Sequence, residues 1–200
     1  LLPKFAREAL FLIPAKTDTT PLPEFSPALQ SALDTRHSTI PRVGFIRGCV
    51  MSVMFGDTNA ASVSLLNRAG YDVVTPPKQG CCGALHAHGG NLAAAREAAR
   101  VNLAAFAREP LDAIIINAAG CGSTLKEYSH LLADDPRAAA FSAKVKDLSE
   151  FLVAAGFQSA IGNRQSAIKV TFHDACHLAH AQRITHPPRL LVKTVAGANY

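Results

Sequence analysis

Short apolar segments alternate with longer amphipathic segments over most of the chain. Four apolar runs have the length of β-strands: residues 43–47, 71–75, 112–116 and 168–173. The third run contains three consecutive isoleucines, a continuous apolar stretch typical of parallel strands that are buried on both faces. The alternation predicts an α/β fold, with a parallel, Rossmann-like open sheet and helices on both faces.

Helix signals fill the segments between these runs. A first helix is expected over residues 55–69, with Asp57 or Thr58 as its N-cap. The Ala-rich residues 91–107 have high helix propensity throughout, and residues 125–132 form a shorter candidate. Each predicted strand is thus connected to the next by helical structure, as crossovers between parallel strands require.

A longer amphipathic stripe follows Asp135-Pro136, a typical N-cap and first-turn proline. Its apolar positions are spaced by three and four residues: Phe141, Val145, Leu148, Leu152 and Ala155. Asp147, with Glu150 three residues later, is a candidate cap for a restart inside the stripe. We therefore expect helical structure from residue 136 to Gly156.

The first 41 residues have a different character. Residues 15–41 are rich in Pro, Thr and Ser and show no sustained hydrophobic period. This composition favours an extended linker, or an arm that wraps a neighbour and makes few contacts with the sheet unless it covers an edge. The compact domain is expected to start near Arg42.

Charge and composition narrow the classes of protein. The net charge of +5 comes from scattered Lys and Arg, which argues against a nucleic-acid partner. No apolar run of about 18 residues predicts a transmembrane helix, and no secretory signal opens the chain, so we expect a cytoplasmic location. The sequence starts at Leu1 rather than Met, and we interpret it as a piece of a longer protein.

Five cysteines in a chain without export signals indicate metal or redox chemistry rather than a disulfide framework. The adjacent Cys81 and Cys82 suit a metal centre that two thiolates grip from one loop. Cys49, Cys121 and Cys176 each follow a predicted strand as well. Loops after parallel strands gather at the carboxyl edge of the sheet. We therefore expect the first four cysteines along the chain to converge there, with their sulfur atoms within about 10 Å of one another.

Other uses of these cysteines stay open at this point. A single cysteine is often a small buried hydrophobe. Four thiolates also satisfy zinc, although the short Cys-x-x-Cys knuckles usual in structural zinc sites are absent, and widely spaced thiolates suit an iron–sulfur cluster better. A thiol–disulfide enzyme that uses Cys81 and Cys82 is a third possibility.

His86 and His88 follow the cysteine pair, and His173 and His177 flank Cys176. They are either solvated loop residues or groups that donate hydrogen bonds to sulfur. The residues Lys126-Glu127-Tyr128 after Cys121 are equally compatible with a helix start and with a solvated turn. No GxGxxG after a strand, Walker sequence or Ser-His-Asp arrangement is present, so the sequence offers no nucleotide-binding or serine-hydrolase motif.

The cysteine spacing resembles that of a known family. The pattern Cys, about 31 residues, Cys-Cys-Gly, about 38 residues, Gly-Cys is similar to the cysteine-rich CCG domain of heterodisulfide reductase and its relatives. Four stretches look most like the iron–sulfur subunits of glycolate oxidase: GCVMSVMFGDTNAASVSLLNRAGYDVVTP, CCGALHAHGG, NAAGCGSTLKEY and FHDACHLAHAQRI. The resemblance spans residues 42–191.

The resemblance implies a domain order. Such iron–sulfur subunits have an N-terminal two-cluster ferredoxin domain followed by two CCG repeats. Residues 1–41 would then be the linker from that ferredoxin domain, residues 42–165 the first repeat, and residues 166–200 the truncated start of the second.

The resemblance also assigns one [4Fe–4S] cluster, with zinc as the alternative, to four thiolates: Cys49, Cys81, Cys82 and Cys121. The family pattern often ends in Cys-x-x-Cys, and Ala118 occupies the first of those two positions. This departure argues against a double cluster of the heterodisulfide reductase type. Cys176 resembles the first cysteine of the second repeat, and the other interpretation is that it replaces the thiolate missing at Ala118.

The activity implied by the resemblance is electron transfer within a hetero-oligomeric glycolate, or 2-hydroxy-acid, dehydrogenase complex. A flavin-containing subunit would oxidise glycolate, and this chain would pass electrons toward an acceptor such as quinone, with peripheral membrane association at the inner face through the complex. The alternatives are the iron–sulfur subunit of an L-lactate oxidation complex and a zinc-binding scaffold without a redox role.

Overall fold

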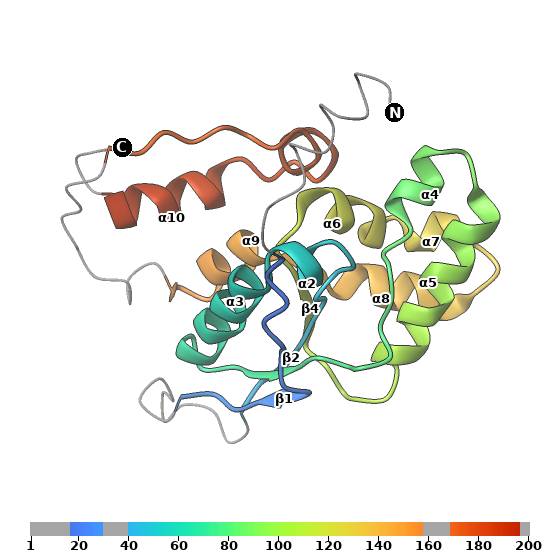
Figure 1. The fold of residues 1–200 in the computed structure, drawn as a ribbon, viewed down its shortest axis with the longest axis horizontal. Coiled ribbons are helices and arrows are strands. Elements are labelled where there is room, and N and C mark those ends of the chain that lie inside the picture. The colour runs from blue at the N-terminus through green and yellow to red at the C-terminus, as the bar shows by residue number, and fades with distance from the viewer. Residues whose placement is uncertain (1–16, 30–39, 158–168, 197–200) are drawn as a thin grey trace, which may run out of the picture.

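The computed structural model describes residues 17–29, 40–157 and 169–196. Its centre is a five-stranded sheet, flanked by helices in Figure 1. The strand order is β1-β3-β2-β4-β5. β2, β3, β4 and β5 pair in parallel, and only β1 at the edge is antiparallel. The strands are β1 (Phe25–Ser26), β2 (Arg42–Phe45), β3 (Asp72–Val74), β4 (Ala113–Ile116) and β5 (Val145–Asp147). The predicted α/β fold with a largely parallel sheet is confirmed.

Helices cover both faces of this sheet (Figure 1). Successive strand residues face opposite sides. Val43, Phe45 and Ile115 pack against one set of helices, whereas Ile114 and Ile116 pack against the other. The helices are α2 (Met51–Met54), α3 (Gly56–Arg68), α4 (Ala84–His88), α5 (Leu92–Phe106), α6 (Ala119–Lys126), α7 (Tyr128–Leu131), α8 (Pro136–Lys144), α9 (Leu148–Ala154), the π-helix η3 (His177–Ala181) and α10 (His186–Ala196). α3 and α9 lie on one face, and α5 and α8 on the other.

The N-terminal arm covers the β3 edge of the sheet and caps a helix. β1 pairs with β3, and the Thr75 N–H donates to the Glu24 carbonyl over 2.8 Å. Neither Asp57 nor Thr58 is the N-cap of α3, which is Phe55 with no side-chain hydrogen bond. Instead Asp18 accepts hydrogen bonds from the first backbone N–H groups of α3, and the Asp57 N–H holds the pKa of Asp18 below its usual value. The expectation of an extended arm that covers an edge is confirmed for residues 17–29, and the rest of residues 1–41, except 40 and 41, lies outside the described residues.

The predicted continuous helical stripe over residues 136–156 is wrong in its middle. Val145–Asp147 leaves the helix and forms β5, because the open edge of β4 offers parallel pairing for Val145 with Ile114 and for Asp147 with Ile116. Val145 is β-branched and buried, which favours the strand. The predicted restart is confirmed, since Asp147 and Glu150 form a complete capping box at the start of α9.

The strand predicted at residues 168–173 is also wrong where the structure describes it. Residues 169–175 have no regular structure, and residue 168 lies outside the described ranges. β5 already occupies the place beside β4 that a further parallel strand would need. The helix predicted over 125–132 starts earlier, at Ala119, and is interrupted between α6 and α7. Among the described residues, no helix is both long enough and apolar enough to cross a membrane.

Candidate metal centre

Three loops bring four cysteines to the carboxyl edge of the sheet. Cys49 lies in the turn after β2, Cys81 and Cys82 end the loop after β3, and Cys121 lies in the first turn of α6 after β4. β2 is the central strand, with β3 on one side and β4 on the other. The strand order therefore reverses at β2, because β3 is added on one side of it and β4 on the other. In open α/β sheets, ligands bind at such a switch point.

The sulfur atoms of these four cysteines interact with one another. The Sγ atoms of Cys49 and Cys81 lie 3.6 Å apart. The Cys82 thiol forms hydrogen bonds with Cys121 and Cys81, and Cys121 also lies within electrostatic range of Cys49. All are free thiols. Cys82 is only 3% exposed, Cys81 and Cys121 are half-buried, and Cys49 is exposed. The site therefore has a buried side and a solvent side.

The pKa values of these thiols shift in different directions, because the thiols interact by hydrogen bonds. The hydrogen bond to Cys121, together with burial, raises the pKa of Cys82, and the same bond lowers the pKa of Cys121. Burial and the neighbouring Cys81 raise the pKa of Cys49. Several adjacent thiolates repel each other, so full deprotonation needs a cation among the sulfurs, as metal ligation provides.

Backbone N–H groups surround the sulfurs. The Gly83 N–H donates to Cys81 Sγ over 3.4 Å, and the N–H groups of Val50 and Ala84 face the sulfurs of Cys49 and Cys82, where they favour the thiolate. Cys121 gains a similar effect from its place in the first turn of α6, where the helix dipole favours negative charge. The surroundings are thus suited to anionic sulfur.

The donor set fits an iron–sulfur cluster. Thiolates select zinc or iron–sulfur clusters among biological metal centres. Within the described ranges, no three metal-ligating side chains are arranged to hold one ion between them. In a cluster each thiolate binds its own iron atom, so the sulfurs need not all lie within bonding distance of one ion.

A buried polar network fixes the loop that carries the cysteine pair. Asn102 on α5 accepts from the Gly80 N–H over 2.9 Å and donates to the Cys81 carbonyl over 2.9 Å. The Tyr128 hydroxyl donates to the Cys82 carbonyl over 2.8 Å and accepts from Asn102 over 3.1 Å. Both side chains are fully buried, and burial raises the pKa of Tyr128, so its hydroxyl stays protonated and able to donate.

Sequence reasoning left Tyr128 undecided and overlooked Asn102. Tyr128 is neither in a solvated turn nor exposed, because it is the first residue of α7 and packs in the core. A signal for Asn102 was present. It lies three residues after Ala99 and seven after Ala95 on the buried stripe of α5, where a polar residue needs a partner.

Gly83 turns the chain from the cysteine pair into α4. Its φ of +84° lies in the left-handed region, and an added Cβ would lie 3.0 Å from the Ala95 carbonyl oxygen. We expect Gly83→Ala to lower the free energy of unfolding by about 2 to 4 kcal/mol, from backbone strain plus a contact that rigid α5 cannot relieve. Gly90→Ala is the matched control, because Gly90 has a φ of +77° but nothing within 4 Å of its added Cβ. Urea unfolding of both variants measures the difference, and equal losses would contradict the predicted contact.

Cys176 precedes a segment that packs on α6, and no described hydrogen bond joins it to the four sulfurs. η3, which follows Cys176, contacts α6. The ring centroid of His177 lies 5.5 Å from that of His88, and Gln182 donates to the Ala119 carbonyl over 2.9 Å. Cys176 itself is exposed. All four histidines are exposed, and among them the described ring contact joins His88 to His177.

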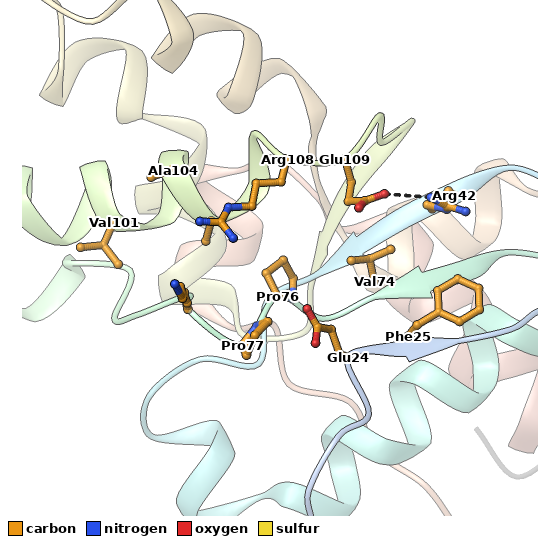
Figure 2. Close-up of a pocket in the computed structure, with 12 residues that line it drawn as sticks. Glu24, Phe25, Arg42, Val74, Pro76, Pro77, Val101, Ala104, Arg108 and Glu109 are labelled. Carbon is orange, nitrogen blue, oxygen red and sulfur yellow. Dashed lines mark hydrogen bonds and ion pairs between the residues drawn. The ribbon is translucent and has the colours of Figure 1, made fainter.

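A separate pocket of about 530 Å³ lies between β1 and α5 (Figure 2). Arg42 and Glu109 form an ion pair of 2.9 Å on its rim, and Arg108 projects over it. Its other lining residues are Glu24, Phe25, Val74, Pro76, Pro77, Lys78, Val101, Ala104 and Ala105. None of the four cysteines lines this pocket, so the cysteine site is separate from it.

The comparison with protein families agrees with the cysteine pattern. Residues 43–126 match the family described as CCG, a cysteine-rich domain. The match runs from β2 through α6 and includes all four converging cysteines. No solved structure matches the chain.

Several curated proteins are similar over most of this chain. The probable glycolate oxidase iron-sulfur subunit of Bacillus subtilis (strain 168) is 46% identical over 80% of the chain and 37% of its own length. An iron-sulfur protein of Methanocaldococcus jannaschii is 32% identical over 77% of the chain and 29% of its own length. Lactate utilization protein A of Geobacillus kaustophilus is 29% identical over 78% of the chain and 66% of its own length.

The chain thus spans little more than a third of the Bacillus subtilis relative and about two thirds of the lactate utilization protein. The similarity, the family match and the four cysteines coincide in one stretch of sequence. Residues 43–126 of the chain match the CCG cysteine-rich domain family, and this stretch contains Cys49, Cys81, Cys82 and Cys121.

Proposed function

We propose that Cys49, Cys81, Cys82 and Cys121 hold a [4Fe–4S] cluster and that the protein is the electron-transfer subunit of a 2-hydroxy-acid dehydrogenase complex. The observation that carries this proposal is the meeting of four free thiols from three loops at the switch point of the sheet. The names of the relatives, an iron–sulfur subunit of glycolate oxidase among them, support the same chemistry.

The residues around the sulfurs have distinct tasks in this proposal. A bound cluster would supply a one-electron carrier. The buried Cys82 would hold it against the core, and the exposed Cys49 would leave one side open toward an electron donor or acceptor. The backbone N–H groups of Val50, Gly83 and Ala84 face the sulfurs, where they would stabilise negative charge on a bound cluster and so help to set its reduction potential.

The proposed partners are a flavin-containing subunit that oxidises glycolate and an acceptor such as quinone. The complex would be cytoplasmic and peripheral at the inner face of the membrane. The second candidate is the iron–sulfur subunit of an L-lactate oxidation system, which the similarity to lactate utilization protein A favours. We assign Cys176 to a second site, because it is exposed and the described contacts of its segment are made by His177 and Gln182.

The test is anaerobic purification of the full-length protein, followed by iron, acid-labile sulfide and zinc analysis. We expect iron and sulfide in comparable amounts and a reducible visible chromophore. Zinc without sulfide would contradict the proposal and support a zinc-binding scaffold. Reduction of the chromophore by the co-purified flavin subunit with glycolate, compared with L-lactate, distinguishes the two substrates.

A further inference from the structure

The Cys82–Gly83 peptide bond is held from both of its polar ends. On one side, its carbonyl accepts the hydrogen bond from the Tyr128 hydroxyl over 2.8 Å. On the other side, its N–H donates to Cys81 Sγ over 3.4 Å. The bond is trans, so its C=O and N–H point in opposite directions. A group that fixes the carbonyl therefore also fixes the direction of the N–H.

The preceding peptide bond is held at its carbonyl, which belongs to Cys81. Asn102 donates to the Cys81 carbonyl and accepts from the Gly80 N–H, so one side chain spans the two residues before Cys82. The second donor of its amide reaches the Tyr128 hydroxyl. The Asn102 carbonyl oxygen and amide nitrogen, and the Tyr128 hydroxyl, therefore all have partners. Asn is a weaker helix former than the alanines around it in α5, so its place there fits a role in holding the loop.

We propose that Tyr128 and Asn102 are positioning residues, which turn the carbonyls of the cysteine pair toward the core and thereby aim the Gly83 N–H at the Cys81 sulfur. Neither side chain ligates metal. The inference rests on the proposed function for its redox consequence, but the orientation of the peptide bond is independent of any bound cluster. Hydrogen bonds to the sulfurs are one of the factors that set the reduction potential of a cluster. The network thus couples a buried phenol to the redox chemistry of the site.

Tyr128→Phe removes the hydroxyl and keeps the ring. The ring stacks on Phe141, with centroids 5.4 Å apart. Without the hydroxyl, the Cys82 carbonyl loses its partner, the peptide bond gains freedom to rotate, and the N–H···S hydrogen bond weakens. We expect the reduced cluster to lose stability relative to the oxidised one by about tenfold in the equilibrium constant, which lowers a one-electron potential by about 59 mV.

Phe141→Leu is the matched control. It weakens packing on the same aromatic ring without touching the hydrogen bonds of Tyr128. If Tyr128 has only a structural role, both variants lose stability, and the reduction potential of the cluster does not distinguish them. The positioning role predicts that only Tyr128→Phe shifts the potential.

The experiment has two readouts on the full-length protein. In the metal-free form, hydrogen exchange at Gly83, followed by mass spectrometry, is expected to accelerate about tenfold in Tyr128→Phe and to stay unchanged in Phe141→Leu. In the anaerobically loaded form, an EPR-monitored redox titration gives the potential, with the signal of this site identified by its loss in Cys82→Ser. Thermal unfolding of each metal-free variant confirms that it folds.

The outcomes separate the inference from the proposed function. Faster Gly83 exchange together with a lower potential, in Tyr128→Phe alone, supports the positioning role. Unchanged exchange in Tyr128→Phe, an unchanged potential, or equal shifts in both variants overturns it. If the wild-type protein binds no iron, the proposed function fails, and the exchange rates alone decide whether Tyr128 orients the peptide bond.

Discussion

Cys82→Ser is expected to remove the iron of this site from the full-length protein, with a loss of more than about tenfold in occupancy. Serine is a poor ligand for iron compared with a thiolate, and cluster ligation depends on Cys thiolates. The position is 3% exposed, so neither solvent nor a mobile side chain can easily supply a substitute ligand. Iron and sulfide analysis, with the EPR signal of the reduced protein, measures the loss.

Cys176→Ser is the control for this prediction. Cys176 is exposed, and none of the described sulfur–sulfur interactions of the other four cysteines includes it. We expect this substitution to leave the signal of the first site in place while total iron falls, and the losses in the double variant to add. Equal and non-additive losses would show that Cys176 completes the first site. Retention of the first signal in Cys82→Ser would contradict the assignment of the four ligands.

Ile115→Ala is expected to lower the free energy of unfolding by about 3 to 5 kcal/mol. Ile115 is fully buried in the middle of β4, between Phe45 of β2 and Lys146 of β5 in register. Truncation leaves a cavity that the flanking strands cannot close, since both are hydrogen-bonded to β4. Denaturant unfolding of the metal-free protein measures the change.

Ile115→Val provides the matched comparison, because it removes one methylene from the same place. We expect a loss of about 1 kcal/mol for Val against the larger loss for Ala. A loss below about 1 kcal/mol for Ile115→Ala would show that the site collapses around the smaller side chain, and that β4 is less rigid than its pairing indicates.

The main strands, and the edge of the sheet at which the cysteine loops gather, could be predicted from the sequence for related reasons. β2, β3 and β4 consist mainly of apolar residues, which predicts that they are buried. A cysteine follows each of the three strands. β5 was not accessible, because Val145-Lys146-Asp147 also fits a helical stripe, and only the open edge of β4 decides for the strand. Residues 169–173 look like a strand in isolation, but β5 takes the neighbouring place.

The support of the site was harder to predict than its ligands. Asn102 comes 20 residues after Cys82 and Tyr128 comes 46 residues after it. Their contacts with the cysteine loop depend on how α5 and α7 pack on the sheet, which no local pattern specifies. Likewise, the cap of α3 comes from Asp18, 38 residues before the helix begins, rather than from the adjacent Asp57.

The 3.6 Å gap between the sulfurs of Cys49 and Cys81 has a consequence for the protein before any metal is bound. An oxidant such as O₂ would accept two electrons, and the two thiols would release two protons as a disulfide forms after a small movement. Such a bond withdraws two of the four ligands at once. Cys49 is exposed, so the oxidant can reach it. Oxidation of Cys49 and Cys81 therefore competes with cluster assembly. In air, the metal-free chain should soon lose its ability to bind iron unless a cellular reductant keeps these two thiols reduced.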